Sequence, residues 1–321
     1  MRKMIYSIIL IIIFLLLFII SLSIGAVQAI TLSTIIHALE IGRVTGVIRY
    51  RLVRSVASII LGAGLGLSGL TMQYALRNPL SDPYLLGVSA GASLGILLAV
   101  IYGGSYSPAL IYGVALFSGI VTFLAVVAIG AGAGGSPSAL IVSGVSVSYA
   151  LSGVSIMLFI KNISKINMTF IWLFGTIAYV IPIYLIYSSL ILFIIIIILI
   201  FNSSRIYSLI LGDDVSESMG VDVKKTRYIA LLSSGGVASA MVALAGPVGF
   251  IGLAAPWMAR LMYGSKYSTV LASSMVIGAI LAQISDIMVR VIGGAQEIPL
   301  TAFTALFGGP LLFYLTRKTG W

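Results

Sequence analysis

Long apolar runs, separated by short polar connections, make up most of the chain. A transmembrane helix needs about 20 consecutive apolar residues, and the sequence offers ten candidates: 5–23, 53–75, 85–102, 109–130, 138–159, 171–200, 228–246, 251–263, 269–290 and 300–316. The run at 251–263 is short for a full span. These runs do not alternate apolar and polar positions as the strands of a membrane barrel do. The pattern predicts an all-α membrane protein of about ten transmembrane helices in a single domain, 1–321.

The first run has an alternative interpretation as a signal peptide. It follows Arg2 and Lys3, and the small residues of 26–29 stand where cleavage would fall. Because 5–23 is long enough to cross a membrane, we expect a transmembrane helix here.

Glycines recur in the second run, at Gly62, Gly64, Gly66 and Gly69. Small residues let two helix backbones approach closely where packing, and not hydrophobicity, drives association. The stretch 64–69 also satisfies the pattern G-x-G-x-x-G, but it lies inside an apolar helix and not between a strand and a helix. These glycines therefore predict helix packing and not dinucleotide binding.

The composition excludes several classes of protein. Of the 321 residues, 60% are hydrophobic and 8% charged, whereas soluble domains carry roughly 25% charge. Ten spans leave no room for a fused ATPase, kinase or dehydrogenase domain. The absence of Cys and the single His, His37, exclude thiolate chemistry, Cys-ligated metals and His clusters, so we expect no metal or other cofactor in this chain. The chain also lacks the G-x-x-x-x-G-K-[ST] loop of nucleotide-binding proteins, and we expect it not to be an enzyme.

The net charge of +10 follows from membrane topology and not from nucleic-acid binding. Cytoplasmic loops of membrane proteins carry an excess of Lys and Arg. With the N-terminus inside, eleven of the 18 basic residues are cytoplasmic: Arg2, Lys3, Arg77, Arg205, Lys224, Lys225, Arg227, Arg260, Lys266, Arg317 and Lys318.

A basic cluster in the first outer segment, about 25–54, runs against this bias. It contains Arg43, Arg49, Arg51 and Arg54. Two interpretations stay open from the residues alone. The arginines either extend to lipid phosphates at the start of the second span, or form a docking surface for an acidic partner outside the cell.

Two polar segments contain Pro, Gly and Ser residues in a pattern that indicates more than a simple connection between helices. In 77–91 (RNPLSDPYLLGVSAG), two prolines forbid a continuous helix, and Gly and Ser residues then allow a new one. In 211–227 (LGDDVSESMGVDVKKTR), which belongs to a cytoplasmic loop of about 205–227, Gly212 and Gly220 are expected to end or begin a short helix. This loop is either a surface that a soluble protein grips or a solvated connection.

Several of these motifs occur together in one known family. The chain resembles the permease subunits of ABC importers for iron-siderophores, haem and cobalamin, the FecCD type. The resemblance covers about 45–316 and is carried by 51–54 (RLVR), 77–80 (RNPL) with 82–83 (DP), 86–91 (LGVSAG), 246–253 (GPVGFIGL), Pro256, Arg260, Asp286, Arg290, Glu297 and Pro299. One departure is Trp257, where the family commonly has His; we expect a packing or interfacial role for its ring.

The resemblance implies a ten-helix subunit whose two halves are related by an inverted pseudo-repeat. It implies a homodimer in the plasma membrane, with both termini cytoplasmic, two cytoplasmic ATPase subunits that bind ATP and Mg, and an extracytoplasmic substrate-binding protein. The cargo would be a metal chelate, such as an iron-siderophore or haem, or cobalamin. Import of molybdate or tungstate is the alternative within the family. A secondary transporter or channel driven by an ion gradient, and a non-transporting scaffold, are the alternatives outside it.

The resemblance also implies roles for individual residues. Arg51, Arg54 and Arg290 fall on positions that dock the binding protein. The ATPase would be coupled through Gly212, Asp213, Asp214, Glu217 and Gly220. The translocation path and gate would include Ser138, Ser143, Ser146, Thr301 and Thr304, although Pro137 replaces the hydroxyl residue that normally accompanies Ser138.

Asp286 lies inside a predicted span. A charge is energetically costly there, and it therefore suggests a functional role. Asp286 is one helical turn from Arg290. We therefore expect an i,i+4 ion pair or a network between helices, and not proton transport.

Overall fold

The computed structural model describes residues 2–25, 46–103, 107–163, 170–294 and 296–319. In these ranges, ten helices have 13 residues or more and no strand occurs: α1 (Arg2–Ser23), α3 (Gly46–Ala75), α4 (Val88–Gly103), α5 (Pro108–Gly132), α6 (Pro137–Lys161), α8 (Pro182–Phe201), α11 (Val223–Ala245), α12 (Ile251–Tyr263), α13 (Tyr267–Gly293) and α14 (Leu300–Thr319). Among the described residues, seven of them (α1, α3, α5, α6, α8, α11 and α13) are long and apolar enough to cross a membrane. The predicted all-α membrane fold is confirmed.

Two boundaries differ from the prediction. The run 171–200 is not one helix: α7 (Phe170–Leu173) ends before Gly175, which has φ 85°, and α8 starts only at Pro182. The second long helix starts at Gly46 and not at 53, so Arg49, Arg51 and Arg54 lie on a helix and not in a loop. Residues 26–45, the rest of the outer segment with Arg43, are outside the described ranges.

Helix α3 is the centre of the fold, packed against α13, α11 and α12. Its glycines lie where other backbones pass. A methyl group added at Gly62 would collide with the carbonyl oxygen of Gly278 on α13, and one added at Gly278 would collide with that of Gly62. The predicted close packing of the glycine-rich helix is therefore confirmed.

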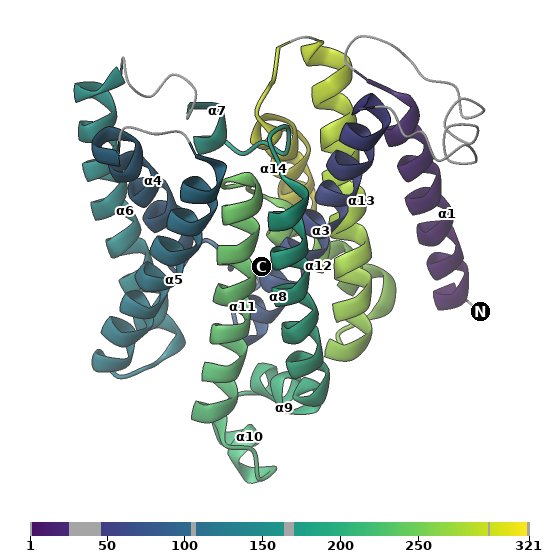
Figure 1. Ribbon diagram of the computed structural model, residues 1–321. Helices are drawn as coiled ribbons and strands as arrows, with labels where there is room; N and C mark the ends of the chain where they lie inside the picture. Colours follow the sequence, from purple (N-terminus) through teal and green to yellow (C-terminus); the bar gives the residue numbers. More distant parts are fainter. Residues whose placement is uncertain (1, 26–45, 104–106, 164–169, 295, 320–321) are drawn as a thin grey trace.

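The other helices surround this centre (Figure 1). Helices α4, α5 and α6 pack together on one side, and α1 packs on α13 at the opposite side. Helix α11 contacts both α3 and α5, and thus joins the two sides. The short helices α9 (Ser203–Ser208) and α10 (Asp213–Ser218), joined by the 3-10 turn η2 (Leu209–Leu211), project from one end of the bundle.

The two halves share an order of elements. Each has a long helix that is mostly buried, α3 or α11. A turn follows that contains proline and a residue with positive φ, Gly87 or Gly246, and then a shorter helix, α4 or α12. This order agrees with a two-part chain, and the inverted relation between the parts stays a prediction.

Candidate functional site

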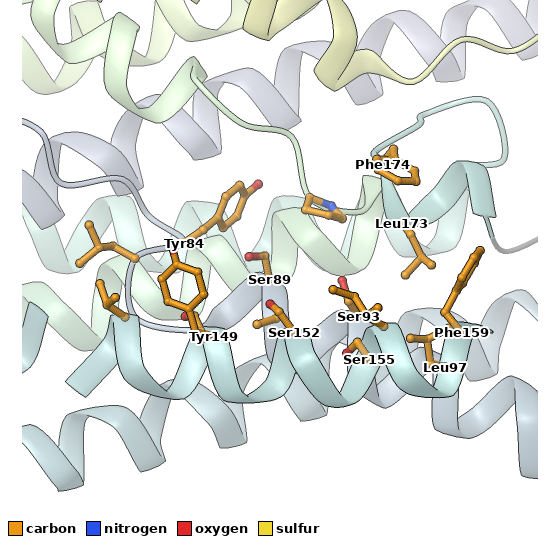
Figure 2. Close-up of a pocket in the computed structure, with 16 residues that line it drawn as sticks. Tyr84, Ser89, Ser93, Leu97, Tyr149, Ser152, Ser155, Phe159, Leu173 and Phe174 are labelled. Atoms are coloured by element: carbon orange, nitrogen blue, oxygen red, sulfur yellow. The ribbon is translucent and has the colours of Figure 1, made fainter. Parts of the chain in front are cut away.

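A cavity of about 560 Å³ lies between α4 and α6. Serines line it from both helices: Ser89 and Ser93 on α4, and Ser152 and Ser155 on α6 (Figure 2). Ser148 on α6 also lines it. Tyr84, Tyr149, Phe159, Phe174 and Pro247 are among the other residues around it. No charged side chain is among its described lining residues, so the cavity offers hydroxyl groups and apolar surface to an occupant.

Helix geometry explains why these serines share a wall. Residues three or four apart lie on the same face of a helix, and Ser148, Ser152 and Ser155 have this spacing, as do Ser89 and Ser93. The Ser155 hydroxyl donates to the carbonyl oxygen of Leu151, 2.8 Å away. The buried Ser148 hydroxyl oxygen has no hydrogen-bond partner among the described residues.

The predicted path residues do not line this cavity. Ser143 is buried on α6, whereas Ser138 and Ser146 on the same helix are exposed. Thr301 donates to the carbonyl oxygen of Pro247, 3.0 Å away, and Thr304 lines a separate cavity of about 240 Å³ between α12, α13 and α14. The structure thus distributes these five residues over several places. The five cavity serines were not predicted, although their helical spacing was visible in the sequence.

The proline-containing segment 77–87 forms one end of the cavity. The Asp82 carboxylate accepts a hydrogen bond from the backbone N–H of Tyr84, 2.9 Å away, and the Tyr84 hydroxyl accepts one from the N–H of Val248 at 3.2 Å. Burial raises the pKa of Asp82 to about 6, although the Tyr84 N–H opposes this shift. Trp257 is 6% exposed and donates to the carbonyl oxygen of Pro79, which confirms its predicted packing role.

A buried charge network joins α3, α13 and the residues before α14. Arg54 Nε lies 2.7 Å from Asp286 Oδ1, and Arg54 Nη1 lies 2.7 Å from Glu297 Oε1. Asp286 Oδ2 lies 2.8 Å from Arg290 Nη2, which confirms the predicted i,i+4 pair. Two carboxylates thus compensate two guanidinium groups, as buried charges require.

Two arginines also bind the C-terminal end of α1. Arg290 Nη1 donates to the carbonyl oxygens of Ser21 and Ile24, at 2.6 and 2.8 Å. Arg51 Nη1 donates to those of Leu22 and Ser23, at 3.3 and 2.8 Å. The last carbonyls of a helix lack partners within it and carry partial negative charge, so these cations stabilise the end of α1.

The predicted docking residues Arg51, Arg54 and Arg290 are buried within the chain. They are only 5%, 2% and 4% exposed, because they bind groups within the chain. An acidic partner would have to displace these internal contacts. Their docking role stays a prediction, and the exposed Arg49 lies on the same end of α3.

The predicted coupling loop is a short helical unit. Gly212, with φ 107°, separates η2 from α10, and Gly220, with φ 78°, follows α10, so both glycines end helices as expected. Asp214 and Glu217 are exposed. Asp213 is directed inward instead, and its Oδ1 lies 2.6 Å from Arg227 Nη2. Contact of this unit with an ATPase stays a prediction.

Solved structures resemble most of the chain. A chain of a transporter described as of the metal-chelate ABC type, in an inward-facing conformation, matches with a TM-score of 0.85 and 26% identity, over 99% of this chain and 100% of that one. PsaBC from Streptococcus pneumoniae, in complex with Fab, matches with a TM-score of 0.57 over 89% and 95% of the two chains; its 16% identity indicates the fold alone.

Relatives by sequence are also named as permease proteins. The Fe(3+)-citrate import system permease protein YfmE of Bacillus subtilis is 32% identical, over 84% of this chain and 81% of that protein. The ferric enterobactin transport system permease protein FepD of Escherichia coli is 31% identical, over 85% and 82%. The cobalamin import system permease protein BtuC of Halobacterium salinarum is 31% identical, over 83% and 72%. The FecCD transport family model matches residues 12–318, and the chain therefore belongs to the FecCD transport family.

Proposed function

We propose that the chain is the membrane-spanning subunit of an ABC importer that moves a ferric chelate into the cytoplasm with energy from ATP. The observation that carries this proposal is the match of the FecCD family over residues 12–318. The resemblance of the full fold to a metal-chelate type transporter chain supports it. Relatives named for Fe(3+)-citrate and ferric enterobactin favour iron as the metal.

The proposed complex contains two copies of this chain, two ATPase subunits in the cytoplasm and a binding protein outside. The chain lies in the plasma membrane with both termini in the cytoplasm. It has no nucleotide-binding loop of its own, so the ATPase subunits bind ATP and Mg, and this chain is not an enzyme. The exposed acidic side chains of α10 support a contact with a soluble subunit, since that helix projects from the bundle.

The cavity between α4 and α6 serves as part of the translocation path in this proposal. Its described lining has hydroxyl groups but no charge. Such a surface passes a bulky chelate by weak contacts, because no charged side chain holds it. Selection of the cargo then belongs to the binding protein. Cobalamin is the second candidate, favoured by the relative from Halobacterium salinarum.

The test is transport by the purified complex, isolated through this chain from native membranes and reconstituted in liposomes. Radioactive ferric citrate is the first probe, and cobalamin and molybdate are measured in parallel. We expect uptake of iron only with the binding protein, ATP and Mg. Uptake driven by a proton or sodium gradient without ATP would refute the proposal and favour a secondary transporter. Uptake of molybdate alone would refute the proposed cargo.

A further inference from the structure

The carboxylate of Asp213 joins three parts of the chain. Asp213 is the first residue of α10, and its Oδ1 lies 2.6 Å from Nη2 of Arg227 on α11. The same oxygen lies 3.5 Å from Nη2 of Arg77, in the turn that follows α3. Arg227 also donates through Nε to the carbonyl oxygen of Ala75, the last residue of α3. One side chain thus links α10 to α11 and to the end of α3.

Helix α10 is itself firmly attached to the helix before it. The buried hydroxyl of Ser216 donates to the carbonyl oxygens of Ser208 and Gly212, 2.7 Å from each. Asp214 and Glu217 are exposed, whereas the Asp213 side chain is two-thirds buried against its arginines. The acidic residues of this unit therefore have different surroundings, and only Asp213 makes an ion pair toward the membrane helices among the described residues of α10.

Arg77 occupies a position that normally favours glycine. Its φ is 48°, a conformation that side chains other than glycine rarely adopt. The N–H of Asn78 donates to the carbonyl oxygen of Gln73, which closes the end of α3 as in the common glycine-containing helix stop. A glycine would make this turn with less strain. The arginine adds a cation that reaches Asp213.

The turn at Arg77 leads directly to the cavity. Pro79 accepts the indole hydrogen bond of Trp257, and Tyr84 and Leu85, a few residues later, line the cavity. A short, proline-containing segment thus connects the turn to the cavity wall.

We propose that Asp213 is a positioning residue that clamps α10 to the segment 77–87. Movement of α10 by an ATPase then moves the end of α3 and the cavity wall together. This inference rests on the proposed function. It assigns Asp213 a different task from Asp214 and Glu217: Asp213 transmits force within the chain, and the two exposed carboxylates are left to face the soluble subunit.

The first test compares Asp213→Asn with Lys266→Gln, an exposed charge removal outside the loop 205–227, in the reconstituted complex. Asp213→Asn should lower the number of ferric citrate molecules transported per ATP by about tenfold, within the usual range of coupling between two sites, while assembly and ATP hydrolysis persist. Lys266→Gln should keep the transport ratio. A normal ratio for Asp213→Asn would overturn the clamp.

Arg77→Gly is the second variant, and it controls for misfolding of Asp213→Asn. Glycine suits the positive φ of this position, so the turn is retained while the cation is lost. We expect a loss of coupling that does not exceed that of Asp213→Asn, since the pair between Asp213 and Arg227 remains. Combining Arg77→Gly with Asp213→Asn should add no further loss, because Asp213→Asn already removes the pair with Arg77. Additive losses, or full coupling in Arg77→Gly, would overturn the proposal.

A distance measurement tests the clamp without any cargo. Because the chain contains no Cys, Leu80→Cys and Ser218→Cys can carry the only two spin labels, and both positions are exposed. In dimers formed with an excess of unlabelled chains, the distribution of distances between the two labels should be narrow with and without ATP. In Asp213→Asn, this distribution should broaden when ATP is added. An unchanged narrow distribution in that variant would refute the clamp. Failure of the unmutated chain to bind any ATPase would instead refute the proposed function.

Discussion

At the scale of single residues, close backbone contacts and buried charges decide what each position tolerates. Gly62 and Gly278 occur in helices, where glycine is unfavourable by about 1 kcal/mol relative to alanine. They are nevertheless suited to their positions, since a methyl group at either would meet the other's carbonyl oxygen. Gly113 on α5 has no such neighbour within 4 Å. The same residue type thus has opposite consequences at two helical positions.

We expect Gly278→Ala to destabilise the chain by about 1–3 kcal/mol, the usual cost of overpacking, because α3 and α13 must separate. Gly113→Ala, the matched control, should be neutral or slightly stabilising through helix propensity. Thermal unfolding in detergent micelles measures both variants. Equal melting temperatures for Gly278→Ala and the unmodified chain would contradict the close contact.

At the scale of elements, the charge network holds separate helices at one end of the bundle. Arg54 connects α3 to Asp286 on α13 and to Glu297 before α14. Arg290 connects α13 to the last turn of α1 through Ser21. Because these groups are buried, removal of one partner leaves charges without compensation, and several helices lose their attachment together.

Asp286→Asn should therefore destabilise the fold by about 3–5 kcal/mol, the cost of breaking a buried pair, since two guanidinium groups lose their shared carboxylate. Arg49→Glu, an exposed change on the same end of α3, should leave the melting temperature unaltered. Thermal unfolding distinguishes the two. A stable Asp286→Asn protein would mean that the network does not hold the helices.

Arg49→Glu also separates docking from folding. If the binding protein docks at this end of the molecule, Arg49→Glu should weaken its binding at low salt, and the difference should shrink as salt screens the charges. Charge reversal at Arg54 or Arg290 is a poorer test, because it disturbs the internal network as well.

At the scale of the whole molecule, the arrangement of helices determines which face of α6 meets a cavity. Ser152 lines the cavity between α4 and α6, whereas Ser146, six residues earlier and on another face of the helix, is exposed elsewhere. Both serines are small hydroxyl residues in the same apolar sequence. Only the packing of α4 against α6 distinguishes them.

Ser152→Trp should reduce ferric citrate transport by about tenfold or more, because the indole ring fills space that the cargo needs, while assembly and ATP hydrolysis persist. Ser146→Trp is the matched variant on the other face of α6. Transport in proteoliposomes measures both. If Ser146→Trp blocks transport and Ser152→Trp does not, the path lies on the face that the sequence predicted and not at the cavity.

The sequence by itself determined the ten long helices and, apart from the starts of α3 and α8, their approximate bounds. About 20 apolar residues are needed to cross a membrane, and prolines and glycines mark the ends of helices. The sequence also determined the pairing of Asp286 with Arg290, because that contact is local to one helix turn. Its motifs were sufficient to indicate the family.

The tertiary structure alone decided which groups meet across long separations in sequence. The apolar pattern of a membrane helix does not mark which face points inward, because lipid and protein interior are equally apolar. Hence the burial of Arg54 between Asp286 and Glu297, and the inward contact of Asp213 with Arg77 and Arg227, were not predictable. For the same reason the cavity serines became visible only when α4 and α6 were placed side by side.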